Sequence, residues 1–429
     1  MATPVILAGA RTPFVRAGDR LRDVPAKELA RRVVQEVLEG SGISPASIDE
    51  VILGNAATPS DAPNIARVVA LTAGLPESTP GLTVHRNCAS GMEAVVLAAQ
   101  KIAAGDAQAI VCGGTESMSR IPMQLSPDAN PWFLQLAKAK SPSRKLAAVA
   151  AAPFRKLLPR SPILEGLTDP VCGLNMGRTA ENLAREFGIT REEQDDYALE
   201  SHRRAVAAQA AGAFDDEIVP VYVGPEFRDV VTADVGPRAS QSKEALAKLR
   251  PVFERVDGTV TAGNSCQITD GAAALIVASE SWATAAGFRP LARIRSHSTR
   301  GLAPARMGLG PAFAIPEALD RAGISFGELG RIEINEAFAA QVLACERALA
   351  SRTFANDELG RSAAVGTIDR ARLNVHGGAI ALGHPIGATG ARLLVTLVAQ
   401  LMSGDDELGL ASLCVGGGQG MAVVLERLA

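Results

Sequence analysis

Three motifs that lie far apart in the chain each carry one reactive side chain beside glycine. Cys88 stands in Asn-Cys-Ala-Ser-Gly, His384 in Gly-His-Pro-Ile-Gly, and Cys414 in Cys-Val-Gly-Gly-Gly. Because a thiol at a helix start lies in the positive end of the helix dipole, Cys88 is predicted to be a nucleophile that favours the thiolate. An imidazole can accept its proton, and a second thiol beside backbone N–H groups can exchange a proton with a carbon acid. Together they predict acyl transfer on a thioester.

Short strands and helices are predicted to alternate along the chain and to position these residues. The helix over 26–40 carries Leu29, Val33 and Val37 on one face, the spacing of a helix that packs on a sheet. The first part of the chain is predicted to hold strands at 5–8, 51–54, 83–86 and 109–112 and helices at 26–40, 64–73 and 88–104. The pattern restarts with strands at 274–278, 332–334, 409–415 and 421–426 and helices at 313–322, 338–350 and 387–402. The predicted fold class is α/β, with two similar halves.

The stretch between the two halves interrupts this pattern. Eight prolines lie between residues 122 and 170, which indicates loops in the first part. The later part is predicted to be helical, because Thr190 and Glu193 have the spacing of a capping box. The predicted domains are an N-terminal half over 1–117 plus 250–280, an inserted loop domain over 118–249, and a C-terminal half over 281–429.

Composition and charge narrow the classes of function. With 43 basic and 46 acidic residues, the net charge of −3 gives no global attraction to nucleic acid. The six cysteines form no C-x-x-C pair, which argues against a disulfide framework or a metal site and favours a reducing compartment. The sequence begins with no basic and apolar leader, and no unbroken apolar run is long enough to span a bilayer. A cytoplasmic protein, soluble or peripheral to a membrane, is expected.

The segment 129–164 is unusual in its charge. It contains seven basic residues and no acidic residue, interleaved with Trp132, Phe133 and several leucines. A basic, amphipathic segment can lie on an anionic membrane surface, or bind a phosphate-bearing ligand or a protein partner. The alternative is a solvated loop whose apolar residues cover the core. The sequence leaves both interpretations open.

Taken together, the motifs resemble those of the thiolase family over nearly the whole chain. The Cys88 motif resembles the nucleophile motif of that family, and the Cys414 motif resembles its C-terminal cysteine motif. Two further motifs, Asn-Glu-Ala-Phe-Ala at 335–339 and Gly-Gly-Ala-Ile-Ala-Leu-Gly-His-Pro at 377–385, also have counterparts there. The resemblance implies the thiolase fold, in which two similar βαβαβαββ halves stack as α-β-α-β-α layers.

The resemblance also implies a reaction, that of a 3-ketoacyl-CoA thiolase, which is an acyltransferase. Cys88 would attack the 3-keto carbon of a 3-oxoacyl-CoA, release acetyl-CoA and pass the remaining acyl group to CoA. His384 would activate Cys88 and donate to the thioester oxygen, and Asn335 would hold a water in the same oxyanion site. Cys414 would protonate the departing carbanion. The backbone N–H groups of Cys88 and Gly416 would form a second oxyanion hole.

Four residues are expected by the same resemblance to line the substrate pocket. Met176 and Phe338 match positions that line the thioester and pantetheine pocket, and Ser265 precedes Cys266 in Asn-Ser-Cys-Gln at 264–267, directly after the matching Thr-Ala-Gly-Asn motif at 261–264. Cys266 stands where many thiolases have a serine that contacts the pantetheine arm, and a thiol is a weaker hydrogen-bond partner. CoA and acyl-CoA are then substrates, and no prosthetic cofactor and no metal are expected.

Two insertions, 129–164 and 351–372, resemble those of the β subunits of fatty-acid oxidation trifunctional complexes. They favour a degradative enzyme of β-oxidation over a biosynthetic acetoacetyl-CoA thiolase, which remains the alternative. The expected assembly is a homodimer or homotetramer. A hydratase/dehydrogenase α subunit is a further expected partner, and 129–164 is the expected site of any peripheral membrane contact.

Two rival classes of protein differ from an active thiolase in the motifs that they need or lack. A β-ketoacyl synthase also uses a cysteine on a doubled fold, but it needs a His-Gly-Thr motif where this chain has Asn-Glu-Ala-Phe at 335–338. A non-catalytic CoA-binding or lipid-binding scaffold subunit would be expected to have lost Cys88, His384 or Cys414. All three are present.

Overall fold

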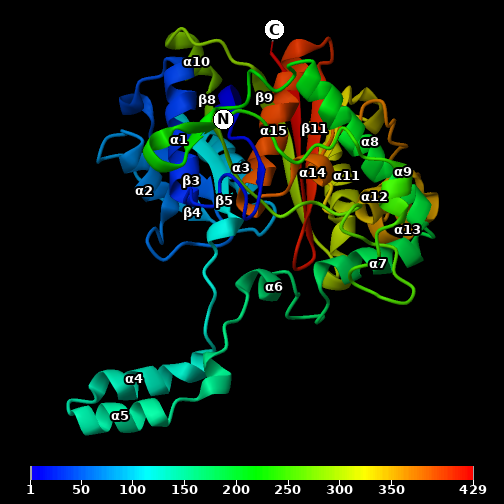
Figure 1. Ribbon diagram of the computed structural model, residues 1–429. Coiled ribbons are helices and arrows are strands. Elements are labelled where there is room, and N and C mark those ends of the chain that lie inside the picture. The colour runs from blue at the N-terminus through cyan, green and yellow to red at the C-terminus, as the bar shows by residue number, and fades with distance from the viewer. Residues whose placement is uncertain (1, 429) are drawn as a thin grey trace. The chain divides into compact units, whose positions relative to one another are not determined.

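A ten-stranded mixed sheet forms the centre of the computed structural model, which describes residues 2–428 apart from the side chain of Phe227 (Figure 1). The two halves of the chain supply the two halves of this sheet. They are joined by the pairing of the first strand with the ninth, Val5 with Arg293 and Ile6 with Ala292. The strand order is β10 (Arg331–Ile334), β11 (Leu408–Val415), β12 (Gln419–Arg427), β9 (Ala292–Gly301), β1 (Pro4–Arg11), β8 (Thr269–Ser279), β5 (Ala109–Ser117), β3 (Glu50–Gly54) and β4 (Gly81–Val84), and β2 (Val15–Arg16) pairs with β8.

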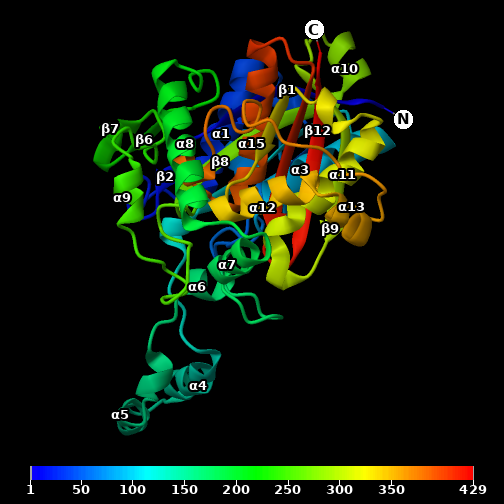
Figure 2. The same ribbon diagram turned by 90° about the vertical axis from the view of Figure 1, so that its right-hand side faces the viewer.

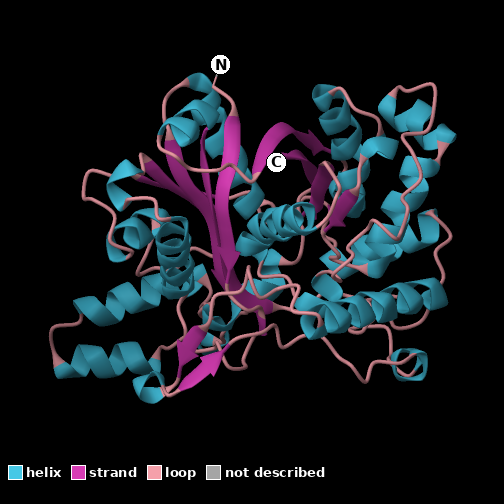
Figure 3. Ribbon diagram, turned by 90° about the horizontal axis from the view of Figure 1, so that it is seen from above, coloured by secondary structure: helices cyan, strands magenta, loops and turns pink. Residues whose placement is uncertain are grey.

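Two helices, α3 (Ser90–Ala104) and α15 (Ile386–Ser403), pack against each other between the two half-sheets (Figure 1 and Figure 2). Side chains of successive strand residues point to opposite faces, so each strand serves two cores. Ile6 and Ile110 face the central helices, whereas their neighbours Val5 and Val111 face the outer helices α1 (Ala26–Ser41) and α2 (Ile65–Thr72). The strands are therefore covered on both faces by helices, as Figure 3 shows.

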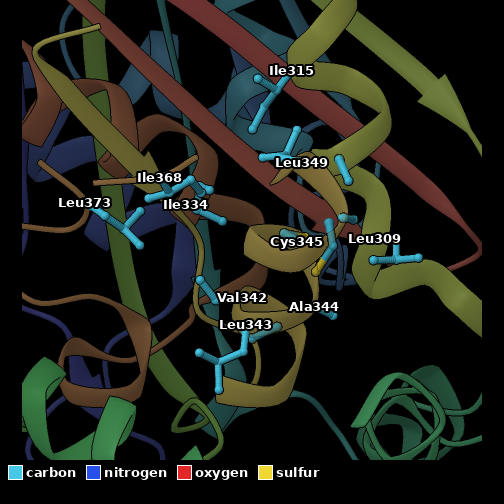
Figure 4. Close-up of a cluster of buried hydrophobic side chains, with 14 of the residues drawn as sticks. Leu309, Ile315, Ile334, Val342, Leu343, Ala344, Cys345, Leu349, Ile368 and Leu373 are labelled. Atoms are coloured by element: carbon cyan, nitrogen blue, oxygen red, sulfur yellow. The ribbon is translucent and has the colours of Figure 1, made fainter. Parts of the chain in front are cut away.

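The outer face of the second half-sheet is covered by α11 (Gly310–Ala322) and α12 (Ala339–Ala350). Leu343, Cys345 and Leu349 of α12 lie in this core (Figure 4). The Cys345 thiol donates to the Gly308 carbonyl at 3.2 Å and is fully buried, so it behaves as a packing residue. The layers follow the order α-β-α-β-α, and the predicted arrangement of two similar α/β halves is confirmed.

Most of the predicted elements are present in the structure. The main element that the sequence did not predict is the strand β9. Its inward positions include Ser296 and Ser298, which are not apolar. Their hydroxyls donate to carbonyls of α11, at 2.6 Å to Ala318 and at 2.5 Å to Ala314. Because this face is buried through hydrogen bonds, it carries no hydrophobic alternation that a sequence could display.

Residues 169–270 add a helical layer that belongs to the same compact unit as the sheet. The predicted capping box is confirmed, since Thr190 and Glu193 exchange bonds between side chain and backbone at the start of α8. The elements here are α7 (Met176–Glu186), α8 (Arg191–Ala210), β6 (Val221–Val223), β7 (Asp229–Val231) and α9 (Lys243–Ala247), and the remaining helices of the unit are α10 (Glu280–Ala285), α13 (Arg352–Leu359) and α14 (Ala379–Leu382).

Residues 121–168 form a second, small unit. Its centre is an antiparallel helical pair in which the Trp132 indole N–H donates to the Ala148 carbonyl at 2.8 Å. An isolated bridge between Gln124 and Arg160 closes its base. Its helices are α4 (Asn130–Lys138), α5 (Pro142–Ala150) and α6 (Pro162–Gly166). The wider loop domain over 118–249 and the boundaries of the two halves stay predictions.

Candidate active site

The Cys88 thiol stands on a tight turn between β4 and α3. Asn87 has a φ of 43°, a left-handed conformation that asparagine tolerates better than most residues. The Ala89 N–H donates to the Arg86 carbonyl at 2.9 Å. The Ser90 hydroxyl accepts from the Arg86 N–H at 2.9 Å and donates to the Asn87 carbonyl at 2.7 Å. Since α3 begins at Ser90, the cysteine lies two residues before the helix, and the helix expected from residue 88 starts later.

The glycine turn between β11 and β12 lies against this cysteine turn. Gly417 and Gly418 have φ values of 92° and 82°, which any side chain would strain. The Asn87 side-chain amide donates to the Gly416 carbonyl at 2.7 Å, and the Gly416 N–H faces the Cys88 thiol. Residues from the first and last parts of the chain are thus bonded to each other at the predicted nucleophile.

The electrostatic state of Cys88 differs from the sequence-based expectation. Burial raises the pKa of the Cys88 thiol, and the Gly416 N–H opposes that rise only in part. Loss of solvation therefore outweighs the field of a helix that starts two residues away. The expectation of a resting thiolate is not met. A neutral thiol needs a base that removes its proton as it attacks.

His384 is held by bonds that define its tautomer. The His384 N–H of the backbone donates to the Gln267 carbonyl at 3.0 Å, and the ring Nδ1 lies 2.6 Å from the Thr389 hydroxyl. That hydroxyl donates to the Pro385 carbonyl at 3.0 Å, so it accepts from Nδ1–H. The proton is thereby assigned to Nδ1, and Nε2 carries a lone pair. Among the described residues Nε2 is buried and has no hydrogen-bond partner.

Burial also sets the charge of this imidazole. Loss of solvation, with a smaller effect from the Arg392 guanidinium, lowers the pKa of His384 to about 4. The ring is therefore neutral at neutral pH. A neutral ring with a free Nε2 lone pair can accept the proton of a thiol, which is the chemistry that Cys88 requires.

Asn335 stands at the end of β10 with an amide that the described part of the protein leaves unpaired. Its backbone N–H donates to the Ser412 carbonyl at 2.9 Å, which aligns it with the strand that leads to Cys414. Asn335 is 0% exposed to solvent. Neither its Oδ1 nor its Nδ2 forms a hydrogen bond with a described residue. Leaving a buried amide without a partner is costly, so such a group is expected to bind a ligand or water.

The residues around Asn335 are braced by a separate network. The Glu336 carboxylate accepts from the Ser201 hydroxyl at 2.7 Å and from the Tyr197 hydroxyl at 3.1 Å. The Asn374 side chain donates to Glu336 at 2.9 Å and also bonds both backbone groups of Ile334. Glu336 therefore fixes the loop that Asn335 begins.

Cys414 ends β11 and is 1% exposed. Burial raises its pKa well above the usual range of a thiol, and the neighbouring thiols of Cys88, Cys345 and Cys266 add to the rise. The side chain is therefore a neutral thiol that can give a proton to a strong carbon base. Its proximity to Cys88 brings the two predicted catalytic thiols into one site.

The four predicted pocket residues lie on three segments that meet here. A Cβ built on Gly416 would lie 3.4 Å from the Met176 sulfur, which places the start of α7 beside the glycine turn. Ser265 pairs with Phe338 as an antiparallel bridge, and its hydroxyl donates to a backbone carbonyl at 2.7 Å. Burial raises the pKa of Cys266 to about 12, so it stays a neutral thiol. Their contacts with CoA stay predictions.

Two residues that the sequence analysis did not single out position the reactive groups. Thr389 fixes the His384 tautomer, and no sequence signal marks it, because a helical threonine usually bonds only its own helix. Asn87 joins the two turns, and its place directly before the cysteine in a turn was a signal that could have found it.

Two further features bear on the chemistry of this site: metal-ligating side chains and long apolar helices. Within residues 2–428, no group of three or more His, Cys, Asp or Glu side chains is placed to hold a metal ion. One helix, α15, is long and apolar enough to cross a bilayer, which the sequence analysis did not foresee, but 78% of it is buried inside the protein. It is a core helix between the half-sheets.

Comparisons with known proteins cover both halves of the chain. Residues 4–281 match the family model of the thiolase N-terminal domain, and residues 288–427 match that of the thiolase C-terminal domain. The chain is 44% identical over 429 residues to an acetyl-CoA acetyltransferase of Escherichia coli (strain K12), covering 100% of each chain. It is 40% identical over 422 residues to a 3-ketoacyl-CoA thiolase of Yersinia enterocolitica, covering 98% of this chain and 96% of the relative.

Solved structures give the same result. The crystal structure of human mitochondrial 3-ketoacyl-CoA thiolase in complex with CoA matches with a TM-score of 0.87 and 38% identity, over 100% of this chain and 98% of that chain. The similar proteins thus carry two names, one for acetyl transfer and one for 3-ketoacyl cleavage.

Proposed function

Because this chain belongs to the thiolase family, an acyltransferase family, we propose that it is a 3-ketoacyl-CoA thiolase of fatty-acid β-oxidation. It would cleave a 3-oxoacyl-CoA with CoA, yielding acetyl-CoA and an acyl-CoA shortened by the acetyl unit. CoA is a substrate in this proposal, and no resident cofactor takes part.

In the proposed first half-reaction, His384 Nε2 takes the proton of Cys88 as the sulfur attacks the 3-keto carbon. The carbon–carbon bond between C2 and C3 breaks, and its electron pair leaves on the acetyl-CoA fragment. Cys414 gives that fragment a proton, and the acyl group stays on Cys88 as a thioester. In the second half-reaction the CoA thiol gives its proton to Cys414 and displaces Cys88, which regains the proton held by His384.

The observation that carries this proposal is the pair of buried groups without partners. His384 Nε2 and the Asn335 amide have no hydrogen-bond partner among the described residues, although both residues are buried. A thioester carbonyl oxygen, or a water beside it, would give the Asn335 amide a hydrogen-bond partner. The Cys88 thiol would give His384 Nε2 a proton donor. A scaffold that only bound CoA would have no use for a buried base with a free lone pair.

The degradative direction is supported by the helical unit 121–168 and by the segment 351–372, which contains α13. The second candidate is a biosynthetic acetoacetyl-CoA thiolase. It is favoured by the relative from Escherichia coli, whose name is acetyl-CoA acetyltransferase and which is 44% identical over its whole length.

Cleavage of 3-oxoacyl-CoA esters of increasing chain length tests these alternatives. The assay follows CoA-dependent loss of the 3-oxoacyl-CoA, with Cys88→Ser as the inactive variant and Cys172→Ser as the matched control thiol. Activity that extends to long chains and is absent only in Cys88→Ser supports the degradative proposal. Activity confined to the four-carbon ester supports the biosynthetic candidate, and no activity at any length overturns both in favour of a scaffold.

The unit 121–168 is proposed to contact an anionic lipid surface. Leu146 is 72% exposed and Phe154 is 75% exposed, on a unit whose segment 129–164 carries only basic charges. Exposed apolar side chains beside basic ones favour an anionic bilayer over a neutral one. The apolar groove between α4 and α5 is flanked by Lys138 and Arg144, which adds to the same surface.

Sedimentation with vesicles tests this contact. The full chain should sediment with phosphatidylglycerol vesicles and not with phosphatidylcholine vesicles, and added salt should release it. The double variant Arg144→Glu with Lys145→Glu should stay in solution, whereas Lys248→Glu, an exposed charge outside the segment, should sediment as before. Equal sedimentation of all three proteins, or none, overturns the contact.

The expected assembly is a cytoplasmic homodimer or homotetramer that can recruit a hydratase/dehydrogenase α subunit. Its support is the family alone. Light scattering of the purified chain measures the first part, since a monomeric mass contradicts it. Co-purification with a hydratase/dehydrogenase subunit expressed beside it measures the second.

A further inference from the structure

The buried carboxylate of Glu116 lies outside the reacting groups and contacts the turn that leads into α15. Glu116 is near the end of β5 and is 1% exposed. Its oxygens accept from the Gly387 N–H at 3.1 Å and from the N–H groups of Ala56 and Ala57 at 2.9 and 3.2 Å. The Asn55 side-chain amide adds a bond at 2.8 Å. One carboxylate therefore ties the start of α15 to the loop that follows β3.

Glycines bring the backbones together at this junction. A Cβ on Gly387 would lie 2.9 Å from Glu116 Oε2, and a Cβ on Gly114 would lie 2.0 Å from the Gly387 carbonyl oxygen. A Cβ on Gly91, the second residue of α3, would lie 2.8 Å from the same oxygen. The starts of α3 and α15, which follow the predicted nucleophile and base, thus touch through backbone atoms. A shift of one start moves the other.

The surroundings of the carboxylate are built for its ionised form. All four donors are neutral N–H groups, and across β8 the residue paired with Glu116 is Gly271. Burial raises the pKa of Glu116 to about 7, although these donors oppose the rise. A protonated carboxyl would turn an O–H toward donors, so one N–H would lose its acceptor. Other titratable side chains on the elements packed here include Asp270 of β8, Lys27 of α1, Glu93 of α3 and Arg392 of α15, and His384 and Cys88 precede the two helices.

We propose that Glu116 is a positioning residue: its ionised carboxylate holds the start of α15 and thereby keeps His384 aligned with Cys88. The inference rests on the proposed thiolase function for the identity of these two reacting groups. In this role Glu116 acts through its bond to the Gly387 N–H and not on the substrate. When Glu116 takes up a proton, the start of α15 loosens, and transfer of the Cys88 proton to His384 slows.

The variant Glu116→Gln tests this role, with Glu217→Gln as the matched control. Glu217 is another buried carboxylate, 3% exposed, but it bonds Arg11 at 2.6 Å and Thr396 at 3.3 Å, away from the start of α15. Two rates are measured from pH 5.5 to 8.5: alkylation of Cys88 by iodoacetamide, read by mass spectrometry, and turnover of 3-oxoacyl-CoA. Alkylation needs no substrate, so it tests the inference even where the proposed reaction fails.

The expected result is a loss that depends on pH. At pH 8, Glu116→Gln should lower both the alkylation rate and kcat by about tenfold, with KM within about twofold, because a misplaced base costs rate without weakening binding. The acid limb near neutrality should be present in the unmodified protein and in Glu217→Gln but absent from Glu116→Gln. Unchanged alkylation in Glu116→Gln, or an equal change in Glu217→Gln, overturns the role.

A second measurement uses the unmodified protein and so does not depend on folding of a variant. Amide hydrogen exchange of Gly387, Ala56 and Ala57 is compared at pH 6 and pH 8 after correction for the intrinsic rate. The three amides should lose protection together at pH 6, by about tenfold or more, while the amides inside α15 keep theirs. Equal corrected protection at both pH values overturns the inference.

Discussion

The side-chain amide of Asn87 donates a hydrogen bond of 2.7 Å to the carbonyl of Gly416 and so joins the turn before α3 to the turn after β11. Asn87 also has a φ of 43°, so its backbone conformation and its side chain serve separate purposes. Glycine adopts this φ without strain but has no amide. One substitution can therefore remove the bond and spare the backbone.

Asn87→Gly is expected to lower kcat by about tenfold while changing the free energy of unfolding by no more than about 1 kcal/mol. The glycine turn would lose the bond that holds the Gly416 N–H at the Cys88 thiol. Steady-state kinetics and urea unfolding measure the two quantities. A kcat equal to that of the unmodified protein would show that the Asn87 side chain is dispensable.

Asn335→Ala is expected to lower turnover without lowering stability, whereas Asn374→Ala is expected to lower stability. The Asn335 amide bonds no described residue, so its loss should leave stability within about 1 kcal/mol but cost a factor of about 10² in kcat. Asn374 bonds Ile334 and Glu336 and has a φ of 44°, so Asn374→Ala should destabilise by about 3 kcal/mol or more. Thermal unfolding and turnover are compared for both. A stability loss as large in Asn335→Ala would argue for a structural amide.

Thr389→Val should reduce turnover because it removes the acceptor that fixes Nδ1–H of His384. Valine has nearly the same shape, so packing is kept while the tautomer is freed. A fall in kcat of about tenfold to a hundredfold is expected, and Thr389→Ser should restore most of it. Thr396→Val changes a buried hydroxyl in the same helix and should keep kcat. Equal losses in both valine variants would point to helix packing instead.

His384→Gln should make the protein less sensitive to acid. The folded protein lowers the pKa of His384 to about 4 from 6.5, so between these values the unfolded chain holds the extra proton. The contribution of the neutral His384 to the free energy of unfolding is therefore fully present above pH 6.5. It is lost progressively as the pH falls from 6.5 toward 4. At pH 5 the loss from this residue is about 2 kcal/mol.

Urea unfolding at pH 7.5 and pH 5 measures this difference. The unmodified protein should lose more stability than His384→Gln on acidification. His202, whose pKa burial also lowers to about 4, is present in both proteins and cancels in the comparison. Identical losses would mean that His384 keeps its ordinary pKa in the folded protein.

Periodicity was sufficient for the elements whose buried faces are apolar. The helix expected over 26–40 is α1 at 26–41, and the helix expected over 387–402 is α15 at 386–403. β9 was missed because its inward serines are satisfied by bonds to α11 that only the folded chain makes. Hydrophobic periodicity identifies buried apolar side chains. It cannot identify buried polar side chains that are hydrogen-bonded to a distant element.

The site could be predicted in its reactive residues but not in their electrostatic states. Cys88, His384, Cys414 and Asn335 were identified by their motifs, and the fold brings their segments together. The thiolate state expected for Cys88 was not found, because burial depends on packing that the local sequence does not encode. Glu116 was not singled out for the same reason: its four donors come from two segments that meet only in three dimensions.

The backbone contacts around Gly387 constrain how this protein could be re-engineered. A Cβ on Gly114 would lie only 2.0 Å from the Gly387 carbonyl oxygen, so no residue larger than glycine fits at position 114. Mutagenesis aimed at new acyl specificity is therefore better spent on Met176, Phe338 and Cys266, which lie on loops and at a helix start. The junction of α3 and α15 cannot be substituted without moving the backbone. Changes in substrate specificity therefore have to come from residues outside this junction.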